Sequence, residues 1–166
     1  MSQQYREGDW FLVPLGAQGS AIGLVARRPK RGTLFAGLFF GPARRAAPEQ
    51  GELDRIVAAD AVLVCRLKDS ALHRGLWRVV GRCSRWRHKD WPIPAFVRKE
   101  GLSGRGIRTE YDADNLTTPA RETEATATDM ALPEDIVYDQ TRVVETLTRL
   151  LAAHKPVQLD PTQWSR

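Results

Sequence analysis

Short apolar runs separated by turn residues dominate the first two thirds of the chain. Residues 10–15 and 21–26 are two such runs, and the Gly-rich stretch 16–20 between them is typical of a β-hairpin. Five further runs have the composition of strands. They are residues 33–40, which we expect to end at Gly41-Pro42, and residues 61–67, 76–81, 92–97 and 107–111. Strands at such close spacing predict an antiparallel sheet.

The pattern changes to helical spacing after Pro133. Six apolar residues then recur so that they fall on one stripe of a helix. They are Ile136, Val143, Val144, Leu147, Leu150 and Leu151. Asp135 or Asp139 is suited to cap the start of this helix, and Pro156 to end it. Residues 112–132 are rich in Thr, Ala, Asp and Glu without periodicity, which is typical of a polar linker.

These patterns predict the fold class and the organisation of the chain. The class is mainly β (α+β), with a strongly bent antiparallel sheet or a small, partly open barrel, and a C-terminal helix over an open edge or an end. We expect a β-rich domain over residues 1–115, a polar linker over 116–132 and a helix over 133–156, packed on the same domain. A chain of 166 residues with 42% apolar residues suits one unit with a buried core.

The apolar runs are also too short for a membrane protein. The longest, Leu34–Phe40, is far below the roughly 20 residues that span a bilayer. The polar first residues lack the apolar segment of a secretory signal. We therefore expect a soluble, cytoplasmic protein without a membrane partner. A reducing cytosol favours free thiols at Cys65 and Cys83.

Charge is distributed unevenly along the chain. Residues 1–108 carry 20 Lys/Arg and 9 Asp/Glu, whereas residues 109–166 carry 5 and 11. The net charges are therefore +11 and −6. A basic body favours an anionic partner, and the acidic part is able to fold back over the basic face.

The chain offers no set of side chains suited to activate water or a nucleophile. His73, His88 and His154 lie outside the usual catalytic and metal-binding motifs. The glycine-rich stretch 101–107 lacks the lysine of a phosphate loop and leads into a strand, so we interpret it as a mobile basic loop. We predict no catalytic residues, no metal site and no cofactor.

Several segments together resemble one bacterial family. They are residues 8–15 (GDWFLVPL), 23–27 (GLVAR), 39–42 (FFGP), 75–81 (GLWRVVG) and 91–96 (WPIPAF). Over residues 8–115 the chain is similar to the immunity protein 26 family, whose name is shared with a HocA-type phosphotriesterase. The resemblance implies a small antidote protein of a bacterial polymorphic toxin system, made beside a toxin and blocking it by direct binding.

The predicted function is therefore neutralisation of a cognate toxin with an acidic surface. Arg and Trp are enriched at binding hot spots, so the densest mixture of basic residues and tryptophan predicts the contact face. Its residues are Arg85, Trp86, Arg87, Lys89 and Trp91, together with Arg27, Arg28 and Arg31.

Two alternatives to toxin binding stay open. The family name implies a phosphotriester hydrolase, although the sequence shows no ligand set for a metal-activated water. A basic surface that bears tryptophan also suits a module that binds nucleic acid, because bases stack on aromatic rings while arginines neutralise the phosphates.

Overall fold

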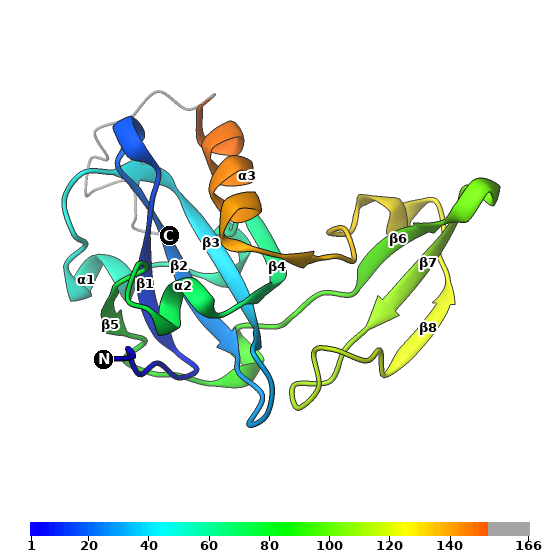
Figure 1. The fold of residues 1–166 in the computed structure, drawn as a ribbon, viewed down its shortest axis with the longest axis horizontal. Coiled ribbons are helices and arrows are strands. Elements are labelled where there is room, and N and C mark those ends of the chain that lie inside the picture. The colour runs from blue at the N-terminus through cyan, green and yellow to red at the C-terminus, as the bar shows by residue number, and fades with distance from the viewer. Residues whose placement is uncertain (153–166) are drawn as a thin grey trace.

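The computed structural model describes residues 1–152, and the strands within them form two separate sheets (Figure 1). The strands are β1 (Asp9–Pro14), β2 (Ser20–Arg27), β3 (Leu34–Arg44), β4 (Leu63–Lys68), β5 (Val79–Arg82), β6 (Phe96–Glu100), β7 (Arg105–Glu110), β8 (Arg121–Glu124) and β9 (Val137–Tyr138). The α-helices are α1 (Gln50–Leu53), α2 (Ser70–His73) and α3 (Gln140–Ala152). The short 3-10 helices are η1 (Gly16–Gln18), η2 (Ala58–Asp60), η3 (His88–Asp90), η4 (Gly101–Ser103) and η5 (Thr128–Ala131).

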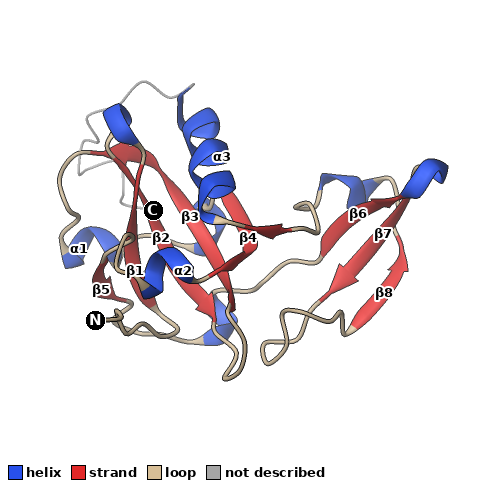
Figure 2. Cartoon of the chain, viewed as in Figure 1, coloured by secondary structure: helices blue, strands red, loops and turns tan. Residues whose placement is uncertain are grey.

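The larger sheet has the strand order β5-β1-β2-β3-β4-β9. Neighbouring strands pair antiparallel, except that β9 pairs parallel with β4. The central strands β2 and β3 are buried along most of their length, as expected for strands that are covered on both faces. The predicted mainly β class with a C-terminal helix is confirmed, and the larger sheet is open, not closed into a barrel (Figure 2).

One face of the larger sheet is covered by α2 and α3. Phe11 of β1 lies in this layer, with the ring of Trp77 stacked on it at a centroid distance of 5.7 Å and an interplanar angle of 5°. α3 contributes its buried stripe, Val143, Leu147 and Leu151. We expected the helix at an edge or an end of the sheet. It covers a face because this stripe packs on the apolar side chains of β3 and β4.

The opposite face is covered by chain that contains only short helices. Trp10 of β1 is fully buried there and meets Trp91 edge to face at 5.6 Å. Phe40 of β3 completes this aromatic group, and Leu53 of α1 is also buried in it. The larger sheet is therefore the middle layer of three, with an apolar cluster on each side. None of the helices within residues 1–152 is long and apolar enough to cross a membrane.

The smaller sheet, with the order β6-β7-β8, projects from the larger one at one end of the molecule (Figure 1). The chain after β8 returns along this sheet: Met130 packs against Gly106, and Asp129 pairs with Arg108 at 3.5 Å. We call residues 96–135 the arm. The larger sheet and the segments that cover it, residues 1–95 and 136–152, are the body.

Besides strand ends that shift by a few residues, such as the strand expected over residues 92–97 that forms as Phe96–Glu100, three sequence-based boundaries differ from the structure. β3 continues past Gly41-Pro42 to Arg44. β4 pairs with β3 only as far as Phe39, so no strand lies hydrogen-bonded to β3 on that side at Pro42. Proline lacks a backbone N–H and is tolerated at such an open edge. Residues 116–132, expected to be a polar linker, contain β8 and η5.

The third boundary is the start of the C-terminal helix. The helix expected over residues 133–156 begins at Gln140, where the Asp139 side chain accepts a hydrogen bond from the backbone N–H of Arg142 at 2.8 Å. Of the two predicted caps, Asp135 and Asp139, the structure therefore uses Asp139. Residues 153–156, with Pro156, lie outside the described residues. The predicted division into domains stays a prediction.

Candidate partner-binding face

The two basic segments predicted to bind a partner lie next to each other in the fold. One is the turn after β2, which begins at Arg27 and Arg28, and the other is the segment between β5 and β6. Glu7 connects them, because its carboxylate accepts a hydrogen bond from the Arg28 N–H at 2.9 Å and also pairs with His88 Nε2. Arg27 adds a direct link by donating from Nη2 to the His88 carbonyl at 3.3 Å.

The segment that carries Arg85 and Arg87 is anchored at its start. The Ser84 hydroxyl donates to Asp54 at 2.8 Å, just after α1, and Gln50 of α1 donates to the Arg82 carbonyl at 2.8 Å. These bonds fix the point at which the chain leaves β5. The basic side chains that follow are therefore presented by a segment held at Ser84 and again at His88.

The two predicted tryptophans occupy different positions. Trp91 is 5% exposed and belongs to the core between Trp10 and Phe40. Trp86 is half-buried and lies on Trp91, with centroids 6.4 Å apart and planes at 14°. Gly8 makes room for it, because a β-carbon at this positive-φ residue would lie 3.0 Å from the Trp86 ring. Trp91 thus supports Trp86, and only Trp86 offers ring surface to a partner.

Arg27 is also buried, with 9% of its surface exposed. Its Nη1 donates to the carbonyl of Ala26, and burial lowers the pKa of its guanidinium while the charge of Glu7 acts in the opposite direction. Arg27 therefore contributes to the face by holding the η3 turn. Like Trp91, it was predicted as a contact residue, and it lies beneath the surface.

The remaining predicted residues are accessible, and we call them the basic face. They are Arg28, Arg31, Arg85, Trp86, Arg87 and Lys89. Arg28 stacks over the Tyr5 ring at 4.1 Å from its centroid, and Arg87 pairs with Asp90 at 2.8 Å. No hydrogen bond or ion pair within residues 1–152 joins Arg31 to the segment 85–91, so Arg31 belongs to the face only through its place in the turn after β2.

The acidic part of the chain does not neutralise the basic face within the described residues. Its carboxylates pair with arginines of the arm and of two neighbouring elements. These pairs are Glu122–Arg98 (2.7 Å), Glu124–Arg105 (3.2 Å), Glu110–Arg108 (2.6 Å), Asp135–Arg66 (2.7 Å) and Glu134–Arg142 (3.3 Å). Arg28, Arg31, Arg85 and Lys89 form no ion pair with any residue of 1–152, so the folding back over the basic face that the charge distribution allows is not seen within these residues.

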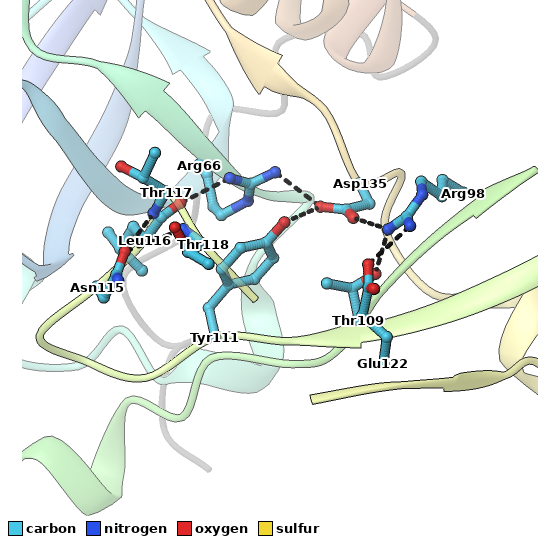
Figure 3. A network of polar contacts seen from close by, with 10 residues as sticks. All are labelled: Arg66, Arg98, Thr109, Tyr111, Asn115, Leu116, Thr117, Thr118, Glu122 and Asp135. Atoms are coloured by element: carbon cyan, nitrogen blue, oxygen red, sulfur yellow. Dashed lines mark hydrogen bonds and ion pairs between the residues drawn. The ribbon is translucent and has the colours of Figure 1, made fainter. Parts of the chain in front are cut away.

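A buried polar network joins the arm to the body (Figure 3). Arg66 of β4 donates to Asp135 at 2.7 Å and to the Leu116 carbonyl at 2.7 Å, and its guanidinium lies 3.9 Å from the centre of the Tyr111 ring. Tyr111 donates to the same Asp135 carboxylate at 2.8 Å, and Arg98 approaches it at 3.3 Å. We call Arg66, Arg98, Tyr111 and Asp135 the Asp135 network.

Burial and hydrogen bonding set the protonation of the Asp135 network. Burial acts to raise the pKa of Asp135, but hydrogen bonds from Tyr111 and Thr109 and the charge of Arg66 outweigh it, so this pKa lies below its ordinary value. Burial, followed by the hydrogen bond to Asp135, raises the pKa of Tyr111 to about 12. At neutral pH the Asp135 carboxylate is therefore ionised and paired with Arg66, while Tyr111 keeps its proton and donates it in a hydrogen bond.

The Asp135 network was not predicted from the sequence. Asp135 appeared only as a helix cap, and the one available signal was an arginine inside the apolar run 61–67. The Asp135 and Arg66 side chains are 3% and 5% exposed, so they are placed to fasten the arm and not to meet a partner. Within residues 1–152 no three His, Cys, Asp or Glu side chains converge as a metal-ligand group would require. His154 lies outside the described residues.

Comparison with known proteins identifies the family of the chain. The family model described as immunity protein 26 matches residues 6–106, which is more than half of the chain. The match contains β1 to β6 and both segments of the basic face, and the family description gives no support to a phosphotriesterase. Comparison with curated proteins and with solved structures yields no match. The chain therefore belongs to the immunity protein 26 family, and this membership implies a bacterial immunity protein.

Proposed function

We propose that this chain neutralises a cognate toxin by binding it directly through the basic face, and that it acts in the cytoplasm. The observation that carries the proposal is the family match over residues 6–106, because an immunity protein acts on a toxin. The basic face lies entirely within the matched residues, whereas most of the acidic residues that are paired in the arm lie after them.

The charges of the basic face suit association with an acidic protein surface. Residues 1–95 carry 16 Lys/Arg and 8 Asp/Glu, and the cations Arg28, Arg31, Arg85 and Lys89 are exposed, with Arg28 lying over the Tyr5 ring. Such a surface steers an acidic partner and raises the association rate. Trp86 adds a half-exposed ring that is already fixed by Trp91, so little side-chain entropy is lost when a partner covers it.

The test measures binding to the protein encoded by the gene next to that of this chain. Arg85→Glu combined with Arg87→Glu should lower the association rate about tenfold at low salt, and added salt should reduce the difference. The matched control combines Arg45→Glu with Arg121→Glu, two exposed arginines outside the basic face, and changes the net charge equally. Surface plasmon resonance at several salt concentrations reports both rates.

Two results would contradict the proposal. One is an absence of binding between the wild-type chain and the neighbouring gene product, accompanied by failure to protect cells that express that product. The other is an association rate that falls equally in the control pair, since this would assign the effect to net charge and not to the basic face. Protection of the cells, lost in the Arg85→Glu, Arg87→Glu variant and kept in the control pair, would support it.

A further inference from the structure

One strongly apolar run of the body stays at the surface. Residues 56–65 (IVAADAVLVC) contain nine apolar residues and one acid, yet only the first and the last, Ile56 and Cys65, are buried. The valines on either side of η2 are the most exposed large side chains of this run, with 53% for Val57 and 41% for Val62. A run of exposed apolar residues lowers solubility, so it is typical of a binding surface. We call Val57, Ala58, Ala61, Val62 and Val64 the apolar patch.

The sheet edge beside the apolar patch is open. β9 pairs with β4 only at Arg66 and Leu67, so within residues 1–152 no strand lies beside Val64 on that side of β4. An apolar edge without a partner strand is a site to which another chain can add. The only charged residue of the run, Asp60, accepts a hydrogen bond from the Val57 N–H at 3.3 Å. The apolar patch is therefore nearly free of charge and lies next to an unpaired strand edge.

The apolar patch and the basic face lie on the same side of the larger sheet. Ala58, Ala61 and Val64 pack on the apolar cluster around Trp10. Trp86 of the basic face packs on the same cluster, whereas α2 and α3 lie on the opposite side of the sheet. One partner is therefore able to contact both surfaces from the same direction.

The basic face alone is too small to be a complete interface. It contains six residues, whereas a specific protein interface contains about 20–30 residues on each side and buries about 800 Å² of each partner. Such an interface has an apolar centre and a polar rim. The basic face supplies cations and one ring, Trp86, so it has the composition of a rim. The apolar patch has the composition of the missing centre.

We propose that the apolar patch is the centre of the toxin-binding surface and that the basic face forms its rim. This inference rests on the proposed function. Both surfaces lie within residues 6–106, the range of the family match, whereas most of the arm lies after it. Charge favours the toxin over a second copy of this chain. Residues 1–95 carry 16 Lys/Arg and 8 Asp/Glu, so two such surfaces repel each other, whereas an acidic toxin is attracted.

The experiment measures the dissociation of the neighbouring gene product from a patch variant that combines Val57→Ser with Val62→Ser. The control combines Leu76→Ser with Leu150→Ser, at exposed leucines after α2 and in α3. The patch variant should dissociate about tenfold faster or more, because two valines lose the burial that the toxin gives them. Its association rate should be unchanged and its effect independent of salt, in contrast to charge reversal on the basic face. The control should keep both rates.

Hydrogen exchange provides a second measurement that needs no variant. Bound toxin should slow exchange at the backbone N–H groups of residues 57–64 and leave α3 unchanged. Equal exchange of residues 57–64 with and without bound toxin would refute the inference.

The outcomes separate this inference from the function on which it rests. If the wild-type chain binds and the patch variant dissociates at the wild-type rate, the apolar patch is refuted as a contact and toxin binding stands. If the wild-type chain does not bind, both are refuted.

Three further results would assign the apolar patch to another occupant and also refute the inference. One is a dimer, seen by sedimentation, that the patch variant dissociates. Another is capture of the wild-type chain, and not of the patch variant, by phosphatidylserine vesicles, while the toxin dissociates from both at one rate. The third is a large fall in the melting temperature of the patch variant without toxin, since this would show that the fold itself buries the two valines.

Discussion

The body and the arm are both β-sheets, but different forces stabilise them. The body has an apolar cluster on each face of its sheet, with stacked and edge-to-face aromatic rings such as Phe11 on Trp77. The arm buries only four residues between 96 and 135. They are Phe96, Val97, Thr109 and Leu116. Its strands are instead connected by ion pairs across the sheet, Arg98–Glu122 and Arg105–Glu124.

Because of this difference, the arm depends on the body for its stability more than the body depends on the arm. Burial of apolar surface contributes about 25 cal/mol per Å², whereas exposed ion pairs contribute about 0–1 kcal/mol each, so the arm has little stability of its own. The best buried contact of the arm is made with the body, through Arg66 and Asp135. We therefore expect the body to keep its structure when the arm opens, and the arm to lose its structure when the body unfolds.

The largest effect is expected from removing an aromatic ring of the body. Phe11→Ala deletes a fully buried ring that contacts Phe35, Phe39 and Trp77. It should lower the free energy of unfolding by about 3–5 kcal/mol, because the cavity adds to the lost burial. Urea denaturation followed by tryptophan fluorescence measures this. Leu76→Ala, at an exposed site, is the control, and a loss below about 1 kcal/mol for Phe11→Ala would refute this account of the body.

A smaller and local effect is expected from breaking the Asp135 network. Asp135→Ala leaves Arg66 buried without its charge partner. Removing one partner of a buried ion pair lowers the free energy of unfolding by about 3 kcal/mol. Hydrogen exchange should become faster in β6, β7 and β8 and stay slow in β2 and β3. Asp114→Ala, at an exposed acid of the arm, is the matched control. Equal acceleration in β2 and β3 would show that the two sheets unfold together.

The same contrast explains what could be predicted from the sequence. The strands β1 to β5 were found because their apolar runs are dense, and α3 because Val143, Leu147 and Leu151 recur at helical spacing. β9 was missed, because Val137–Tyr138 lies in the range that the same spacing assigned to the helix. β8 was missed because Arg121–Glu124 is polar at every position and forms only through pairing with β7. A strand held by cross-strand charges leaves no apolar alternation to detect.

In the candidate face, too, the sequence alone does not show which single residues are buried and which are exposed. Trp86 and Trp91 lie five residues apart in one basic stretch, yet one is half-buried and the other is a core residue. Their neighbours in the sequence do not distinguish them, because Trp91 is buried by Trp10 and Phe40 from distant strands. The part played by Glu7 was equally hidden, since it depends on the turn after β2 meeting η3.

Acid should loosen the arm before the body. The pKa of Asp135 is depressed in the folded chain, so its contribution to stability is present above the unfolded value near 4 and is lost as the pH falls through the folded value. Hydrogen exchange in β6 and β7, measured from pH 6 downwards, should therefore show progressive opening below about pH 4. Asp135→Asn should remove part of this dependence, and an unchanged profile in that variant would assign it to other carboxylates.

High pH should also weaken the Asp135 network, through Tyr111. The pKa of Tyr111 is raised to about 12, above its ordinary value near 10, by burial and by its hydrogen bond to Asp135. Its contribution to stability is complete below about pH 10 and is lost as the pH rises towards 12. Unfolding measured at pH 9, 10 and 11 should show this decline, and Tyr111→Phe should reduce it. An identical decline in the variant would show that Tyr111 is not its source.

The smallest effect is expected at an ion pair on the surface of the arm. Arg105 and Glu124 are 58% and 68% exposed, so water and salt screen their attraction across the strands. Glu124→Gln should change the free energy of unfolding by less than about 1 kcal/mol, and 0.5 M salt should remove even this difference. Because Asp135→Ala and Glu124→Gln each remove one carboxylate from the arm, a larger loss in the first variant measures the contribution of burial. Equal losses would mean that the arm is held by its surface charges and not by its buried contact with the body.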